Sequence, residues 1–312
     1  MIYTVTLNPA VDRELTVPAV EFDSVLRATE ARVDFGGKGF NVSRLLKGLG
    51  SDSTAVGFLG GRAGELLQDG LQSLGIGTDF VWVPGETRTN VSIVNQSHDH
   101  YIKVNEKGPQ VTEEKQTELL EKIDSLAAPG DWWVLAGSLP PGISDDFYSR
   151  IVNVLYKHGA NAILDTSGES LRLGCVEHPY LVKPNAEEAK AITGLPMESS
   201  IDIAAAAAEI RTLGAQNVVV SMGKAGALLN TTEGTWLTHS PKIQEKNPIG
   251  AGDSMVGGLV WALTQGIGLK EALGWGVASG AATASLPGTE VGTQPLIEEL
   301  FKQVRFEKLE TV

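Results

Sequence analysis

One stretch of the sequence has the residue types to act on a bound anion. Gly250, Ala251 and Gly252 are followed by a single carboxylate, Asp253, and then by the apolar run 255–263, which favours a helix. Small residues let the backbone approach a ligand closely, and the unpaired amides at the positive end of a helix bind anions. A carboxylate there could remove a proton from a hydroxyl group that attacks the anion. The alternative is that Asp253 is an ordinary N-cap residue, because aspartate is favoured at that position.

A second glycine-rich turn lies near the N-terminus. Gly36, Gly37, Lys38 and Gly39 precede a predicted helix that contains Asn41. Glycines and a lysine at the start of a helix suit an anionic or hydroxylated ligand. The spacing matches neither the phosphate loop G-x-x-x-x-G-K-[ST] nor a complete dinucleotide fingerprint, which disfavours an NAD-dependent oxidoreductase. Taken alone, the stretch fits a packing turn with a solvated lysine equally well.

The elements that must position these residues alternate between strands and helices. Strands are predicted at 2–7, 53–58, 81–83, 131–135, 161–164, 180–182 and 217–221, and helices at 64–74, 113–126, 145–158, 201–213 and 298–309. Such alternation predicts a mostly parallel sheet with right-handed crossovers, in which ligands bind beyond the carboxyl ends of the strands. Polar clusters follow the strands at 136–142, 165–168, 183–188 and 222–226. We therefore expect the binding site at that edge of the sheet.

Two segments carry β patterns without a helical period. They are residues 13–35 and 87–107, and the second is typical of a hairpin. We expect them to form a small sheet, a lid, over a larger α/β domain. No internal repeat, linker or low-complexity tract divides the chain, so residues 1–312 are predicted to form one domain with the lid inserted in it. An exposed lid edge could pair with another copy of the chain in a homodimer.

Composition and charge bound the class of protein. Hydrophobic residues make up 42% and charged residues 20% of the 312 residues, which allows a full core. The formal net charge of −13 disfavours a general nucleic-acid or anionic-membrane surface. Cys175 is the only cysteine, so an intrachain disulfide is excluded and a reducing compartment fits. The N-terminal segment has no signal-peptide pattern, and no apolar run is as long as the about 20 residues that a membrane span needs. We therefore expect a cytoplasmic protein without a membrane partner.

The two glycine-rich stretches together carry a resemblance to a family. Residues 36–44 and 247–258 resemble the two signature motifs of the PfkB sugar kinases, also called the ribokinase-like family. Segments 6–12, 137–142 and 183–188 are also similar to that family, and all five occur in the family's order across almost the whole chain. Within the family, the GGKG-x-NV stretch and the opening TLNP-x-x-D resemble the hexose-phosphate branch. The second signature motif leans towards the 1-phosphofructokinases.

The resemblance implies a three-layer αβα ribokinase-like fold with a mostly parallel central sheet and a β lid, and a cleft that binds ATP and a sugar phosphate. It implies ATP-dependent phosphorylation of a ketohexose phosphate, D-fructose 1-phosphate to fructose 1,6-bisphosphate, with tagatose-6-phosphate kinase as the alternative. Asp253 would be the general base, and the amides of Gly250, Ala251, Gly252 and Asp253 would form the anion hole for the transferring phosphoryl group. A catalytically silent sugar-phosphate-binding regulator is a further alternative, against which the intact carboxylate argues.

On the sugar side, the family pattern assigns Asp12, Gly37 and Asn41 to the sugar hydroxyls and places Ser138 in a loop that approaches the substrate. The phosphate of the substrate needs cations in this acidic chain. The candidates are Lys38, Arg88, Lys103 and Arg27. Asp12 could instead be a turn residue, and the last two cations could be solvated lid charges.

On the nucleotide side, Asn185 and Glu188 are three positions apart and share a helix face. The resemblance implies that they organise Mg²⁺ and the phosphates of ATP, Glu188 through water, since Mg²⁺ keeps several of its waters. The alternative for Glu188 is an acid favoured at a helix N-terminus. The remaining ATP-binding candidates are Ser221, Gly223, Gly226, Gly252, Ser279 and Gly280; for Ser279 and Gly280, close helix packing is the alternative.

Overall fold

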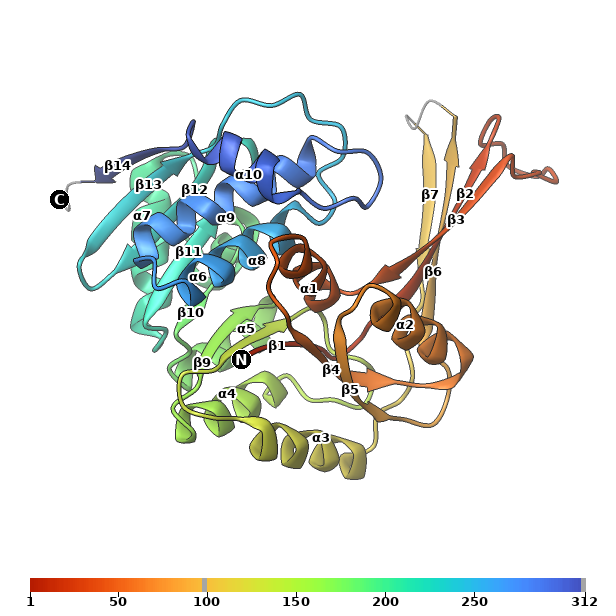
Figure 1. Cartoon of the computed structure of the whole chain (residues 1–312), viewed down its shortest axis with the longest axis horizontal. Coiled ribbons are helices and arrows are strands. Elements are labelled where there is room, and N and C mark those ends of the chain that lie inside the picture. Colours follow the sequence, from red (N-terminus) through yellow and green to blue (C-terminus); the bar gives the residue numbers. More distant parts are fainter. Residues whose placement is uncertain (97–99, 310–312) are drawn as a thin grey trace.

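A ten-stranded sheet forms the centre of the computed structural model, which describes residues 1–96 and 100–309 (Figure 1). Its strands in chain order are β1 (Ile2–Thr6), β4 (Thr54–Leu59), β5 (Gly77–Trp82), β8 (Trp132–Ala136), β9 (Asn161–Asp165), β10 (Leu181–Val182), β11 (Asn217–Ser221), β12 (Gly226–Thr231), β13 (Gly234–His239) and β14 (Arg305–Leu309). Across the sheet they lie in the order β14-β13-β12-β11-β10-β9-β8-β1-β4-β5. The strands from β11 to β5 pair in parallel, and β12, β13 and β14 form an antiparallel edge. The predicted mostly parallel sheet is confirmed.

Helices cover both faces of this sheet and complete three layers (Figure 1). They are α1 (Lys38–Gly48), α2 (Gly61–Ser73), α3 (Glu113–Leu126), α4 (Phe147–Lys157), α5 (Gly168–Val176), α6 (Ala186–Thr193), α7 (Ser200–Thr212), α8 (Ala251–Thr264), α9 (Leu269–Ala284) and α10 (Gln294–Phe301), with a short 3₁₀ turn η1 (Gly223–Ala225). Successive strand residues point to opposite faces, so each strand feeds two cores. Tyr3 and Val5 pack in the core with α3 to α7, whereas Ile2 packs in the core with α1, α8 and α9.

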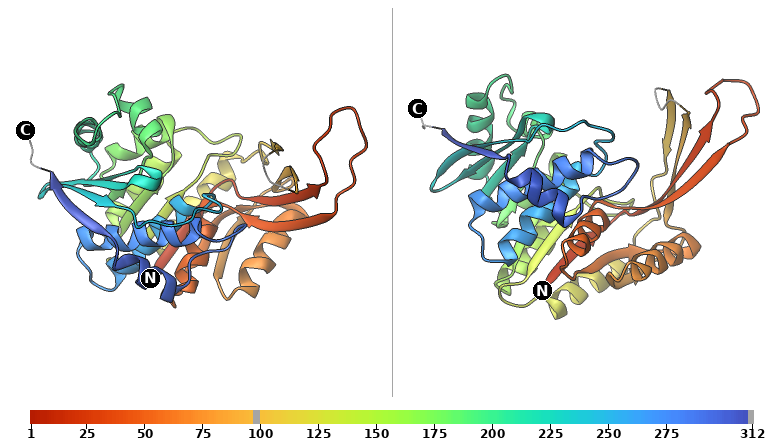
Figure 2. Two further views of the ribbon diagram at one scale, coloured as in Figure 1. Left: turned by 90° about the horizontal axis from the view of Figure 1, so that it is seen from above. Right: turned by 45° about the horizontal axis from the view of Figure 1, so that its top comes forward.

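A second, four-stranded sheet contains most of the two predicted β segments and is called the lid below. It contains β2 (Ala10–Val17), β3 (Glu30–Gly36), β6 (Arg88–Asn95) and β7 (Tyr101–Asn105), in the order β3-β2-β6-β7, with β2 and β6 parallel. The β2–β3 hairpin extends away from the three-layer body (Figure 2). The first lid strand begins at Ala10, earlier than the predicted segment, and Asp12 therefore lies within a strand. The alternative of a turn residue at that position is wrong.

The predicted helix at 298–309 is also wrong in part. Helix α10 ends at Phe301, and Arg305–Leu309 forms β14, which pairs antiparallel with β13. The aromatic ring of Phe306 lies against Gly274 of α9, where a methyl group would meet it at 2.5 Å. The open edge of β13 supplies backbone hydrogen-bond partners to this segment, and periodicity along the sequence does not report such partners.

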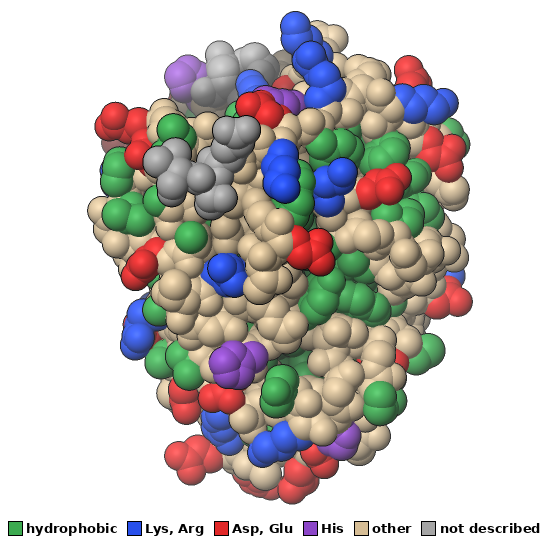
Figure 3. Space-filling view, turned by 90° about the vertical axis from the view of Figure 1, so that its left-hand side faces the viewer, with side chains coloured by type: hydrophobic (Ala, Val, Ile, Leu, Met, Phe, Trp, Pro, Cys, Tyr) green, Lys and Arg blue, Asp and Glu red, His purple; other side chains and the backbone are tan. Residues whose placement is uncertain are grey.

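Figure 3 shows Lys, Arg, Asp and Glu side chains interspersed over the face at the β14 edge, without a block of one sign. Within the described residues, the structure contains no helix with the length and apolar character needed to cross a membrane.

Candidate functional site

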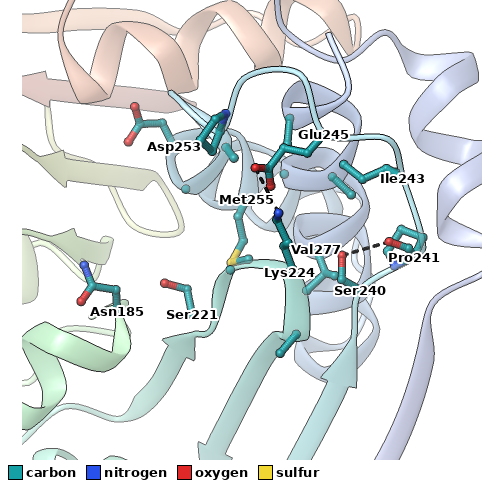
Figure 4. A pocket seen from close by; sticks show the side chains of 18 of the residues that line it. Asn185, Ser221, Lys224, Ser240, Pro241, Ile243, Glu245, Asp253, Met255 and Val277 are labelled. Carbon is teal, nitrogen blue, oxygen red and sulfur yellow. Dashed lines mark hydrogen bonds and ion pairs between the residues drawn. The ribbon is translucent and has the colours of Figure 1, made fainter. Parts of the chain in front are cut away.

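A cavity of about 1040 Å³ lies beyond the carboxyl ends of β9, β10 and β11, at the edge where the polar clusters were expected (Figure 4). Apolar side chains such as Ile243, Met255 and Val277 line one part of it, and polar groups line the other. The predicted site residues on its wall are Lys38, Asn185, Glu188, Ser221, Gly223, Ala251, Gly252, Asp253 and Gly280. The fold thus brings the two glycine-rich stretches and the loops after three strands to one place.

Helix α8 places Asp253 at the cavity. The helix begins at Ala251, and its N-cap is Gly250, whose φ of 78° is left-handed and favours glycine. Asp253 therefore lies in the first turn and makes no capping bond, so the N-cap alternative is wrong. Its carboxylate is only 8% exposed and accepts a hydrogen bond from Asn41 Nδ2, at 2.8 Å from Oδ2. The side chain of Asn41 on α1 thus orients the carboxylate of Asp253 on α8.

The surroundings of Asp253 shift the pKa of its carboxyl group towards neutral pH. Burial and, to a smaller extent, the nearby charge of Asp165 raise the pKa of Asp253, which reaches about 6. The hydrogen bond from Asn41 and the charges of Lys38 and Lys183 act in the opposite direction. A general base works best when its pKa lies near the working pH, which is the range reached here.

Two lysines and a buried aspartate stand beside Asp253. Asp165, at the end of β9, is 1% exposed and lies 3.1 Å from Lys38 Nζ and 3.3 Å from Lys183 Nζ. Burial disfavours the charge on Lys38, but the carboxylates of Asp165 and Asp253 outweigh it and raise the pKa of this lysine. A methyl group on Gly252 would lie 3.8 Å from Lys183 Nζ, so this ammonium faces the helix start. Positive charge is therefore held where an anion would meet α8.

Sequence reasoning did not select Asp165 or Lys183 as site residues. Each belongs to a polar cluster that follows a strand, at 165–168 and 183–188, and this position was the available signal. Their pairing could not be inferred, because it depends on β9 and β10 being neighbours in the sheet.

The backbone at the start of α8 is partly available to a ligand. The amide of Ala251 donates to Pro248 O at 3.2 Å, and that of Ser254 donates to Gly250 O at 2.8 Å. The amides of Gly252 and Asp253 lie between them in the first helical turn, where no residue four positions earlier in the helix can accept. Of the predicted anion-hole groups, these two are the best placed.

Asn185 and Glu188 are held by each other. The Asn185 side chain accepts from the Glu188 amide, and the Glu188 carboxylate accepts from the Asn185 amide, both at 2.8 Å, in a capping box of α6. The alternative of an acid at a helix N-terminus is therefore confirmed. Both residues nevertheless line the cavity, and the backbone of Asn185 forms an isolated parallel β-bridge with Ser221 at the end of β11.

Two of the residues that were predicted to bind ATP are buried in the protein interior. Gly226 is buried at the start of β12, where a methyl group would come within 1.9 Å of Thr238 O. Ser279 is fully buried, and a methyl group on Gly258 of α8 would lie 2.1 Å from its Oγ. Close helix packing accounts for Ser279, whereas its neighbour Gly280 lines the cavity.

The base of the lid brings the predicted sugar-binding residues together. Asp12 on β2 accepts a hydrogen bond from Asn90 Nδ2 of β6 at 2.8 Å, and a methyl group on Gly36 would lie 2.2 Å from Asp12 Oδ2. Gly37 follows with a φ of 154° and leads into α1, on which Asn41 stands. Asn90 was not predicted from sequence, since its relation to Asp12 depends on the parallel β2–β6 pairing.

Arg88 ties the connections of the lid to one another. Its guanidinium donates to Asn8 O at 2.9 Å, Glu106 O at 3.2 Å and Pro9 O at 3.4 Å. These carbonyls belong to the segments that enter β2 and leave β7. Burial lowers the pKa of Arg88, and the charge of Asp12 opposes this effect.

The other predicted cations and Ser138 are exposed to solvent. Lys103 lies on β7, and Arg27 lies in the turn of the β2–β3 hairpin that projects from the body (Figure 2). Ser138 lies in the loop after β8. In this structure they stand apart from the cavity wall that holds Asp253.

The chain is similar in sequence and in structure to known carbohydrate kinases. The model of the pfkB family carbohydrate kinases matches residues 5–295. The chain is 37% identical to 1-phosphofructokinase from Bacillus subtilis over 309 residues, 99% of this chain and 100% of that relative. It is 31% identical to tagatose-6-phosphate kinase from Staphylococcus epidermidis, over 97% of this chain and 98% of that one. The tetrameric inhibited form of phosphofructokinase-2 from Escherichia coli has a TM-score of 0.89 at 30% identity, covering 96% of this chain and 98% of that one.

Proposed function

Since the chain belongs to the pfkB family of carbohydrate kinases, which are ATP-dependent phosphotransferases with an alcohol acceptor, we propose that it phosphorylates D-fructose 1-phosphate at the 6-hydroxyl. The product would be fructose 1,6-bisphosphate. The full-length identity to 1-phosphofructokinase from Bacillus subtilis supports this substrate, and the identity to tagatose-6-phosphate kinase supports the alternative, tagatose 6-phosphate.

The observation that carries the proposal is the buried carboxylate of Asp253 on the cavity wall, with its pKa raised to about 6. At neutral pH it would be ionised and able to accept the proton of the attacking hydroxyl. General-base catalysis is worth roughly 10²–10⁴-fold. A sugar-phosphate-binding regulator has no use for such a base, and burying its charge costs stability.

The start of α8 would stabilise charge on the transferring phosphoryl group. The amides of Gly252 and Asp253 lie at the positive end of the helix, and the ammonium groups of Lys38 and Lys183 stand beside them. Phosphoryl transfer depends mainly on positioning and electrostatic stabilisation, which one loop and two lysines would supply together.

Mg²⁺ would accompany ATP. The described residues contain no group of three or more His, Cys, Asp or Glu side chains arranged to hold a metal. The residues on the cavity wall suit Mg²⁺ only when the ATP phosphates also coordinate it. Mg²⁺ keeps several of its water ligands and needs only one or two protein carboxylates. Glu188 lines the cavity and would contact the ion through water. The bound ion would neutralise charge on the phosphates.

The sugar phosphate would lie between the cavity and the base of the lid. Asp12 and Asn41 would bind its hydroxyls, because the Asp12 carboxylate lies beside Gly36 and the Asn41 amide lies beside Asp253 and Gly250. Arg88 would contact its phosphate with guanidinium hydrogens that the three carbonyl bonds leave over. Lys103 and Arg27 would reach it only if the lid moved.

A panel of substrates tests the proposal. Purified enzyme with MgATP is assayed for ADP release with fructose 1-phosphate, tagatose 6-phosphate and fructose 6-phosphate. The highest kcat/KM is expected with fructose 1-phosphate, and a clear preference for another sugar would contradict that choice. Asp253→Asn should lower kcat by about 10²–10⁴-fold while ATP still binds. Near-normal turnover in this variant would remove the base assignment.

The lid would also join two copies of the chain. Phe22, Val25, Tyr101 and Val104 on the lid are 59–83% exposed, and such apolar groups mark association surfaces. The tetramer formed by phosphofructokinase-2 from Escherichia coli also supports self-association. Sedimentation equilibrium should give a dimer for the wild-type chain and a monomer for Val25→Asp. A monomeric wild-type chain at micromolar concentration would contradict the proposal.

A further inference from the structure

One loop contacts the lid, helix α1 and the segment that precedes helix α8 at the same time. It comprises residues 285–292, between α9 and α10. We infer that this loop is a latch that couples closure of the lid over the sugar phosphate to occupation of the nucleotide cavity, and that Thr289 and Asp34 are its positioning residues. The inference rests on the proposed function, because it assumes that the two substrates bind on either side of the loop.

Among the described residues, the lid side of the latch contains a short hydrogen bond, and Arg32 of β3 also packs against Gly288 of the loop. Thr289 Oγ1 donates to Asp34 Oδ1 of β3 at 2.6 Å, across 255 positions of sequence. Asp34 is itself oriented by Arg32, whose Nε lies 2.8 Å from its Oδ2. Two residues further on, β3 ends at Gly36, which packs against Asp12 at the base of the lid. Movement of this strand therefore moves the sugar-binding residues and the latch together.

A second contact connects the loop to α1. Arg44 Nη2 donates to Thr289 O at 2.9 Å. Arg44 follows Asn41 by three positions, so the two lie on one face of α1. Asn41 is the residue that donates to the carboxylate of Asp253. The backbone of Thr289 thus binds Arg44, which lies one turn of α1 away from Asn41, the residue that orients Asp253.

The other side of the loop is built into the wall of the nucleotide cavity. The loop begins where α9 ends, at Ala284, which lines the cavity and whose carbonyl accepts the amides of Lys246 and Asn247 at 2.8 and 3.2 Å. Asn247 Nδ2 in turn donates to Gly288 O at 2.7 Å. A nucleotide that orders this wall would therefore order the residues next to Thr289.

The end of the loop is connected to α8 through Thr283 of α9. The amide of Gly292 donates to Thr283 Oγ1 at 3.1 Å, and Thr283 Oγ1 donates to Ser254 Oγ at 2.8 Å. Ser254 is adjacent to Asp253 in the first turn of that helix. With both ends of the loop anchored to the nucleotide side, its centre is the part that reaches the lid.

Coupling between two ligands is measured as the factor by which one changes the affinity of the other, commonly 5–150-fold. Isothermal titration calorimetry would give the Kd of fructose 1-phosphate for the free enzyme and for enzyme saturated with Mg²⁺ and the non-hydrolysable analogue AMP-PNP. We expect at least a fivefold lower Kd in the presence of the analogue for the wild type. Thr289→Val should bring this ratio below about twofold, while the Kd of AMP-PNP alone stays within twofold of the wild type.

Two further variants separate the hydroxyl group from general loss of packing. Thr289→Ser retains the donor and should retain the wild-type ratio. Asp34→Ala removes the acceptor and should give the same loss as Thr289→Val, with no further loss in the double variant. Thr117→Val is the matched control, since Thr117 Oγ1 donates to Glu113 O within α3. If Thr289→Val fails to fold, Asp34→Ala provides the test.

The outcomes for the latch and for the proposed function are distinct. A wild-type enzyme that phosphorylates fructose 1-phosphate but shows no change in Kd with AMP-PNP overturns the latch alone. The same holds if both the Thr289→Val and Asp34→Ala variants keep the wild-type ratio. A wild-type protein that phosphorylates none of the sugar phosphates in the panel overturns the proposed function and the latch with it.

Discussion

Replacing Asp253 with asparagine should stabilise the folded chain at neutral pH, although it removes the proposed base. The carboxylate is buried, and its pKa is raised from the ordinary 3.8 to about 6. Above pH 6 the folded protein must hold a charge that its surroundings disfavour. Asparagine has the same shape, carries no charge and can still accept the hydrogen bond from Asn41.

The magnitude follows from the shift in pKa. A rise of about two pKa units corresponds to a destabilisation by the ionised group of about 3 kcal/mol at pH 8. Because the folded pKa lies above the unfolded one, this group favours folding fully below pH 4 and loses that contribution as the pH rises through 6. At pH 5 the acid is mostly protonated in the folded state, and the destabilisation caused by its ionisation falls to about 1.5 kcal/mol.

Urea unfolding followed by tryptophan fluorescence would measure this effect at pH 8 and pH 5. Asp253→Asn should raise the free energy of unfolding by about 3 kcal/mol at pH 8 and by about half as much at pH 5. Asp69→Asn, at an exposed position of α2, is the matched control and should change it by less than about 0.5 kcal/mol. An Asp253→Asn variant no more stable than wild type at pH 8, or equally stabilised at both pH values, would refute the electrostatic reasoning.

Two further predictions concern catalysis. The kcat of the wild-type enzyme should fall about tenfold per pH unit below pH 6, as Asp253 becomes protonated, and in Lys183→Met this acid limb should move to higher pH because a charge that opposes protonation is gone. A flat profile between pH 5 and 8 would count against this assignment. Gly36→Ala should raise the KM for the sugar phosphate several-fold, because the added methyl group would come within 2.2 Å of Asp12 Oδ2, and the Kd of ATP should not change. Equal losses for both substrates would indicate a general defect in folding.

Much of the fold could be predicted from patterns along the chain. The alternation of apolar runs and amphipathic segments predicted the strands from β1 to β11 and most helices, because each element shows its own periodicity. The hairpin of β12 and β13 and the strand β14 were not predicted. Their backbone pairs with other edge strands, and this pairing has no counterpart in local periodicity. For the same reason Arg305–Leu309 was assigned to a helix.

The role of Arg88 shows the same limit at the site. Its charge and its place at the start of β6 suggested a phosphate contact. Only the folded chain brings the carbonyls of Asn8, Pro9 and Glu106 around its guanidinium. Three hydrogen bonds to segments distant in sequence give it a structural role that residue type and position do not reveal.

The sequence by itself determined the chemistry of the loop before α8. Small residues, one carboxylate and an apolar helix within a dozen positions place amides and a proton acceptor side by side, because these relations are local. The tertiary structure alone decided how strongly Asp253 holds its proton. Asn41, Asp165 and Lys183 come from three other elements, and the removal of water that raises the pKa is a property of the packed surroundings. Desolvation and charge pairing depend on distance in space, which residue order does not encode directly.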